Sequence, residues 1–360
     1  MNPELKADET GISQNRLSPG HLNRLKVAGA IMTTIGIGLF AFFIYTVGVG
    51  ELLAGIERFG LIGFGIILAL HLLRMSVRAM AWSLSVYEPY ELSFRDTLPA
   101  VLIGEAMSSL IPLGILVSGT SKAVAVRHRV PLVVGLSSVA TENLFYSLTT
   151  SLFLILGAVT FLRSYPLDEG WTATIDVIIA GIVLLLIFLF LMVVRQWHIA
   201  SETCERLYQR VYFRGILEHG RMHVRLFENL IYSFYRRYPR RFLPICGLGT
   251  LYHVLGVVEV WFILSRLTDG IPSLLNSFLL ESVSRMINIL FKLIPMAIGV
   301  DEAGAQFVGE TVGLAVGVGV TLTIIRKGRT LFWTMIGLLL ILKRGLSLRK
   351  LALNSDDAVG

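Results

Sequence analysis

The sequence predicts an all-α protein that crosses a membrane several times, and three observations carry that prediction. Hydrophobic residues make up 54% of the 360 residues, charged residues make up 16%, and the mean hydropathy is +0.70. Apolar runs of about 20 residues recur along the chain, and each is long enough for a helix to span a bilayer. Charges interrupt some of these runs, and proline and glycine follow them closely. We expect about eight membrane segments, of which two are broken or re-entrant.

The charge distribution divides the chain into five parts. Residues 1–26 form a polar arm whose lysines and arginines favour a cytoplasmic N-terminus, and residues 27–47 read as a retained span rather than a cleaved signal peptide. The other four parts are a first membrane half at 27–194, an arginine-rich cytoplasmic linker at 195–241, a second membrane half at 242–345 and a tail at 346–360. The linker reads as amphipathic surface helices, serving either as an anchoring connector or as a regulatory, lipid-sensing element.

Several classes of function find no support in the sequence. The net charge of +7 points to membrane topology and anionic lipid, because no segment interleaves basic and aromatic residues as a nucleic-acid surface requires. Cys204 and Cys246 lack metal-ligand spacing. No nucleophile, metal or paired-carboxylate motif of an enzyme is present, so we expect no catalytic residues, no metal and no cofactor.

The predicted span at 60–82 carries three polar residues on one helix face. His71, Arg74 and Arg78 are spaced i, i+3 and i+7, which places them together. Two interpretations are open. The arginines either snorkel from near the helix end to the headgroups or form a site for a lipid phosphate.

The segment at 98–117 is long enough to span, but its content predicts a broken hairpin. It contains Glu105 and Pro112 and leads to Gly119, Lys122 and the basic loop at 127–129. A full crossing would place that loop outside, whereas a hairpin returns it to the cytoplasm, as the positive-inside rule requires. Full spans are expected next at 131–161, which carries Glu142 and Asn143, and at 172–194.

A polar stripe dominates the second half, after a span at 242–265 that carries His253 and Glu259. Glu281, Arg285, Asn288 and Lys292 fall within about 60° of one another at roughly 100° per residue. Each charge at mid-bilayer costs roughly 2.5–3.5 kcal/mol, so the stripe must face partners or water inside the protein. The breaks at Pro295 and Gly299 then precede the acidic pair Asp301-Glu302.

The last part of the chain contains a glycine-rich run at 312–325, and its small residues permit close helix contact. The RKGR sequence at 326–329 is expected to form a cytoplasmic loop. The apolar run at 330–342 is too short for a comfortable span, and both of its flanks are basic. The orientation of these last two segments stays open.

The two halves contain similar elements in the same order, which suggests a two-fold internal repeat. Each has a full span, a polar helix with a glutamate (Glu105 or Glu281) and an Ile-Pro dipeptide (at 111–112 or 294–295), followed by a restart containing glycine. Paired broken segments at corresponding positions indicate the binding site of a transporter. Half-helix N-termini there offer N–H donors and a positive dipole to a phosphate.

These features together resemble the transmembrane domain of lysylphosphatidylglycerol synthases, a flippase-like family that also occurs as stand-alone membrane proteins. The likeness covers most of 25–345 and is most specific at 294–304, IPMAIGVDEAG, with further matches at 110–122, Arg74/Arg78, Glu142 and Arg326. The resemblance implies movement of a modified phospholipid between leaflets. The synthase's soluble aminoacyl-transferase domain has no counterpart in these 360 residues, so we do not carry synthase activity over. Ser118-Gly119 and Asn143 depart from the family pattern and leave the substrate open.

With this resemblance, the leading hypothesis is a multi-pass lipid translocase for an anionic or modified phospholipid in the inner (plasma) membrane of a bacterium. The alternatives are a membrane-embedded enzyme acting on a lipid or lipid-linked sugar, with Glu302 or Glu281 as base, and a non-catalytic partner of a lipid-modifying enzyme. A membrane lipid is the expected partner, and nucleic acid is not. The predicted substrate-binding residues are Arg74, Arg78, Glu105, Lys122, Glu142, Glu281, Arg285, Asn288, Lys292, Asp301, Glu302 and Arg326, with helix breaks at Pro112, Gly119, Pro295 and Gly299.

Overall fold

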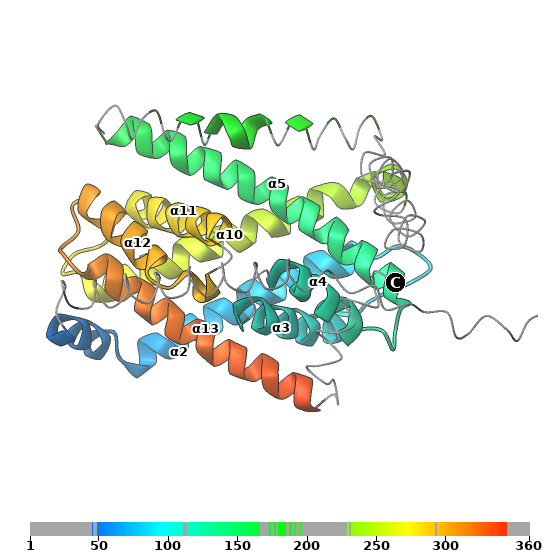
Figure 1. Ribbon diagram of the computed structural model, residues 1–360, viewed down its shortest axis with the longest axis horizontal. Coiled ribbons are helices and arrows are strands. Elements are labelled where there is room, and N and C mark those ends of the chain that lie inside the picture. Colours follow the sequence, from blue (N-terminus) through cyan, green and yellow to red (C-terminus); the bar gives the residue numbers. More distant parts are fainter. Residues whose placement is uncertain are drawn as a thin grey trace, which may run out of the picture.

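The computed structural model describes residues 49–110, 114–165, 232–291 and 294–343, together with scattered positions from 45 to 229. All regular structure in these ranges is helical, as predicted (Figure 1). The first half contains α2 (Val49–Leu84), α3 (Phe94–Leu110), α4 (Gly114–Ala125) and α5 (Leu132–Ser164). The second half contains α10 (Pro239–Leu267), α11 (Leu274–Leu290), the short 3-10 helix η3 (Pro295–Ala297), α12 (Val300–Thr311) and α13 (Val318–Lys343).

Three helices in the described residues are long and apolar enough to cross a membrane. They are Leu52–Leu84, Leu132–Ser164 and Pro239–Leu267, of 33, 33 and 29 residues. At 1.5 Å per residue even the shortest reaches about 43 Å, more than the hydrocarbon core requires. They match the spans predicted at 60–82, 131–161 and 242–265. The predicted span at 172–194 and most of the linker lie outside the continuously described ranges.

In the first half, the segment predicted to form a broken hairpin contains two helices that pack against each other. α3 ends at Leu110 and α4 begins at Gly114, and Gly104 of α3 lies against the side chains of Lys122 and Ser118 on α4. Pro112 lies outside the described residues. The prediction that Gly119 breaks the chain is wrong, because Gly119 lies inside α4.

The break predicted in the second half is confirmed. It extends over more residues than Pro295 and Gly299, the two positions predicted to cause it. α11 ends at Leu290, before Pro295, and α12 starts only at Val300. Between them, Met296 and Ala297 adopt φ of 56° and 48°, and Gly299 adopts φ of 84° as the N-cap of α12. Lys292 lies outside the described residues. The regular structure described between α11 and α12 is the short η3, and the positive φ values there end the α-helical conformation that carries the polar stripe.

We expect Gly299→Ala to destabilise the protein by about 1–2 kcal/mol, because an alanine at positive φ brings Cβ against the following carbonyl. The measurement is the thermal unfolding midpoint of the purified protein in detergent. Gly270→Ala is the matched control, since Gly270 has open space around it and an ordinary φ. Equal midpoints for both variants would show that the restart of α12 does not depend on this glycine.

The C-terminal prediction is wrong, because the RKGR sequence lies within a helix rather than in a loop. α13 runs without interruption through 326–329, and Arg326 and Arg329 are buried. The run at 330–342 is therefore the second part of α13. The positive-inside rule misassigned these charges because they pair with carboxylates from other helices. The expected close contact of the preceding glycine-rich run is observed at Gly319, which lies against the α12 backbone.

The two helix pairs with a break enter the molecule from opposite ends (Figure 1). α3 and α4 join the end where α2 stops and α5 begins, whereas α11 and α12 join the end where α10 stops and α13 begins. α2 packs on α10; α3 packs on α2, α4 and α13, and α11 packs correspondingly on α10, α12 and α5. Each helix of the first half therefore has a counterpart with equivalent neighbours in the second half: α2 corresponds to α10, α3 to α11, α4 to α12 and α5 to α13.

Candidate functional site

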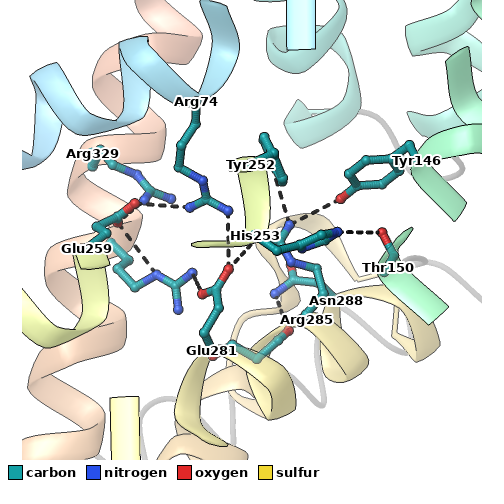
Figure 2. A network of polar contacts seen from close by, with 12 residues as sticks. Arg74, Tyr146, Thr150, Tyr252, His253, Glu259, Glu281, Arg285, Asn288 and Arg329 are labelled. Carbon is teal, nitrogen blue, oxygen red and sulfur yellow. Dashed lines mark hydrogen bonds and ion pairs between the residues drawn. The ribbon is translucent and has the colours of Figure 1, made fainter. Parts of the chain in front are cut away.

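Two fully buried glutamates lie at the centre of the molecule, where α2, α10, α11 and α13 meet (Figure 2). Glu281 of α11 accepts hydrogen bonds from three arginines. Its Oε1 lies 3.2 Å from Arg74 Nη2 and 2.5 Å from Arg285 Nη2, and its Oε2 lies 2.6 Å from Arg326 Nη2. One carboxylate thereby joins α2, α11 and α13.

Glu259 of α10 binds a second, overlapping set of arginines. Its Oε2 accepts from Arg74 Nη1 at 3.0 Å, its Oε1 pairs with Arg329, and Arg326 Nε lies 3.8 Å away. Four arginines (74, 285, 326 and 329) therefore surround two carboxylates, which leaves two positive charges in this cluster. We call these six residues the central cluster.

A pair of tyrosines borders the central cluster. The Arg74 guanidinium lies 4.4 Å from the centre of the Tyr252 ring, and Arg285 Nη1 donates to the hydroxyls of Tyr252 at 3.5 Å and Tyr146 at 3.4 Å. The two rings meet edge to face at 5.5 Å. Cation–π contacts hold guanidinium groups without neutralising their charge. The tyrosines therefore position the arginines and leave the positive surplus intact.

A second charged group belongs to the first half of the chain. Arg78 Nε donates to Glu142 at 3.0 Å, Arg78 Nη2 donates to Asn143 at 3.1 Å, and Lys122 Nζ lies 3.7 Å from Glu142. Arg78 also covers the Tyr146 ring at 4.4 Å, so Tyr146 links this group to the central cluster. A small pocket adjoins it, lined by residues of α2, α5 and α10 that include Arg78, Glu142, Tyr146 and Tyr252.

A third group lies where α12 begins. Glu302 accepts a hydrogen bond from the Gly299 N–H at 2.7 Å and pairs with Lys327 of α13. This carboxylate therefore caps the restarted helix and ties it to α13. Its neighbour Asp301 is buried beside Ser284 of α11, whose carbonyl accepts from Asn288 at 2.7 Å.

Several buried arginine N–H groups have no hydrogen-bond partner within the described part of the chain. They are Arg74 Nε, Arg285 Nε, Arg326 Nη1 and Arg329 Nε. Buried donors are nearly always satisfied in folded proteins, so orphaned donors in an electropositive interior indicate a place for an acceptor. A phosphate oxygen combines the required charge and hydrogen-bonding capacity. No group of His, Cys, Asp or Glu in the described residues could hold a metal ion.

The structure sorts most of the predicted residues into these three groups. Arg74, Glu281, Arg285 and Arg326 meet in the central cluster, which excludes snorkelling for Arg74, a side chain that is 1% exposed. Glu105 is half-buried on α3, close enough to Arg78 and Lys122 to interact electrostatically, and forms no ion pair within the described ranges.

Sequence reasoning left Glu259, Arg329 and Lys327 out of the site. Glu259 could have been identified from the sequence. It is a carboxylate inside an apolar span and needs a partner there, which is the argument that identified Glu281. The two α13 cations were hidden by their assignment to a loop. Tyr146 and Tyr252 gave no signal, because isolated tyrosines in spans are common interior residues.

The fold and the buried ion pairs define a multi-pass helical membrane protein with a charged interior. The chain belongs to the family described as the lysylphosphatidylglycerol synthase TM region, whose model matches residues 27–337. The resemblance expected from the sequence is thereby confirmed. No curated protein and no solved structure matches the chain.

Proposed function

We propose that the protein moves an anionic or modified phospholipid between the leaflets of a bacterial inner membrane. The observation that carries this proposal is the positive surplus of the central cluster, where four arginines surround two carboxylates inside the membrane domain. Uncompensated charge in such a place is costly and marks a substrate path. The family match associates the chain with the membrane region of a lipid-modifying enzyme.

The geometry supports an anionic headgroup as the transported group. The unpartnered donors of Arg326 and Arg285 are buried in the cluster, and the positive-φ residues Met296, Ala297 and Gly299 follow α11, the helix that carries Glu281. When a phosphate leaves the membrane surface it loses hydrogen bonds to water, and these arginine donors can replace them. Two ion-paired carboxylates keep the arginines in place when the headgroup is absent.

The arrangement of the helices supports a transporter with two inverted repeats. α2–α5 and α10–α13 have interchangeable packing, and their broken hairpins enter from opposite ends. This is the pattern in which two repeats enclose a central site and expose it alternately.

The exposed charges support an orientation for this arrangement. In the continuously described ranges, six exposed arginines lie at one end, at positions 95, 127, 129, 236, 237 and 240, and three lie at the other, at 58, 163 and 266. Arg58 and Asp269 pair at the other end, at 2.5 Å. By the positive-inside rule the arginine-rich end faces the cytoplasm.

A leaflet-resolved assay tests the proposal. Purified protein is placed in vesicles containing fluorescent phosphatidylglycerol, and a membrane-impermeant quencher reports the label that reaches the outer leaflet. We expect the protein to increase label exchange over protein-free vesicles and Arg285→Ala to lower that rate at least tenfold, since Arg285 contacts Glu281 and both tyrosines.

Arg163→Ala is the control, because Arg163 is exposed at the end of α5. Its exchange rate should equal that of the wild type. Exchange no faster than in protein-free vesicles, or equal rates for the two variants, would refute the proposal.

A further inference from the structure

Asp301 differs from the other buried carboxylates of the described residues. Glu142, Glu259, Glu281 and Glu302 each pair with an arginine or lysine. Asp301 is only 7% exposed and forms no ion pair with any residue that the structure describes, and its Oδ1 atom has no hydrogen-bond partner there. An ionised carboxylate in such a place is unfavourable unless a proton or a cation joins it.

The groups that face Asp301 come from each helix packed against α12. Ser284 of α11 lies beside it, Arg326 and Lys327 of α13 interact with it electrostatically, and Glu302 is its neighbour on α12. Lys327 is already paired with Glu302. Arg326 binds Glu281 through Nη2 alone, while its Nη1 has no hydrogen-bond partner among the described residues.

We propose that Asp301 takes up one proton when an anionic headgroup binds Arg326, so that headgroup and proton move together. This inference rests on the proposed function and names the ion that would accompany the lipid. The ionised Asp301 carboxylate and the headgroup phosphate compete for one guanidinium. Protonation of Asp301 ends that competition, because the neutral carboxyl neither attracts Arg326 nor repels the phosphate.

The coupling has a definite sign. Headgroup and proton each favour binding of the other, as linkage requires. Affinity for the headgroup is therefore highest at acid pH, where Asp301 carries its proton, and falls as pH rises and the proton is lost. The fall is at most about tenfold per pH unit for one linked proton. Glu302 cannot take this role while both of its oxygens hold Gly299 and Lys327.

Proton uptake on lipid binding tests the inference directly. Dioctanoyl phosphatidylglycerol is added to purified protein in weakly buffered detergent containing a pH-indicator dye, and binding is followed in parallel by calorimetry. The wild type should take up about one proton per lipid bound near the pH at which Asp301 titrates, and should bind more weakly at pH 8 than at pH 6. Asp301→Asn should bind without proton uptake and with the same affinity at both pH values.

Two controls separate this inference from the proposed function. Glu310→Gln removes an exposed carboxylate from the same helix and should leave proton uptake at the wild-type level. Dioctanoyl phosphatidylcholine, which has no net charge, should cause no uptake. Lipid binding by the wild type without proton uptake would overturn the coupling and leave the proposed function standing, whereas absence of phosphatidylglycerol binding at every pH would overturn both. The wild-type result does not depend on any variant folding.

Discussion

Glu281→Gln is expected to lower the free energy of unfolding by about 3–5 kcal/mol, the cost typical of removing one partner from a buried ion pair. Glu281 accepts from Arg74, Arg285 and Arg326 and is fully buried. The amide is isosteric but uncharged, so three guanidinium groups lose their shared counter-charge in a region of low dielectric. The effect should appear as a large decrease in the thermal unfolding midpoint of the protein in detergent.

An exposed pair provides the comparison for Glu281. Asp269 contacts Arg58 at 2.5 Å with a side chain that is 94% exposed, so Asp269→Asn should change stability by at most about 1 kcal/mol. Adding Arg326→Gln to Glu281→Gln should recover part of the loss, because one uncompensated charge is removed with the carboxylate. If Glu281→Gln were as mild as Asp269→Asn, the central cluster would not hold these helices together.

Gly319→Ala is expected to destabilise the protein by about 1–3 kcal/mol or more, as overpacking of a tight interface does. A Cβ at position 319 would lie 2.3 Å from the carbonyl oxygen of Ala305 and 2.9 Å from the Gln306 nitrogen. Both are backbone atoms within α12, so no side-chain rotation can relieve the clash. α13 would have to move away from α12, which also separates Lys327 from Glu302.

A glycine in open surroundings gives the opposite expectation. Gly247 is exposed within α10 and a Cβ there would meet nothing within 4 Å, so Gly247→Ala should raise stability by about 0.5–1 kcal/mol through helix propensity. The unfolding midpoints of the two variants should therefore shift in opposite directions. An unchanged or higher midpoint for Gly319→Ala would mean that the α12–α13 contact is not tight.

The sequence carried enough information to locate the polar face of α11 and the break between α11 and α12. The signals were energetic: charges within apolar runs need partners, and proline or glycine ends a helix. The same reasoning identified Arg74 and Arg78 as interior candidates. It misplaced Gly119, since a glycine within a helix and one at a break look alike when no φ is known.

Pairing between distant segments could not be read from the sequence. Arg74 meets Glu259 and Glu281 across separations of 185 and 207 residues, and spacing rules on single helices do not reach that far. The error at 326–329 has the same origin. Four basic and small residues between apolar runs look like a loop until carboxylates from α10 and α11 are placed beside them.

The long separation within the central cluster has a consequence for how the protein is made. At about 5–20 residues per second, the 207 residues between Arg74 and Glu281 take roughly 10–40 s to synthesise. During that interval α2 holds an arginine whose counter-charges have not yet been made. Arg74 can therefore reach its paired, buried position only after α10 and α11 have been made, and the cost of burying its charge is offset late in synthesis.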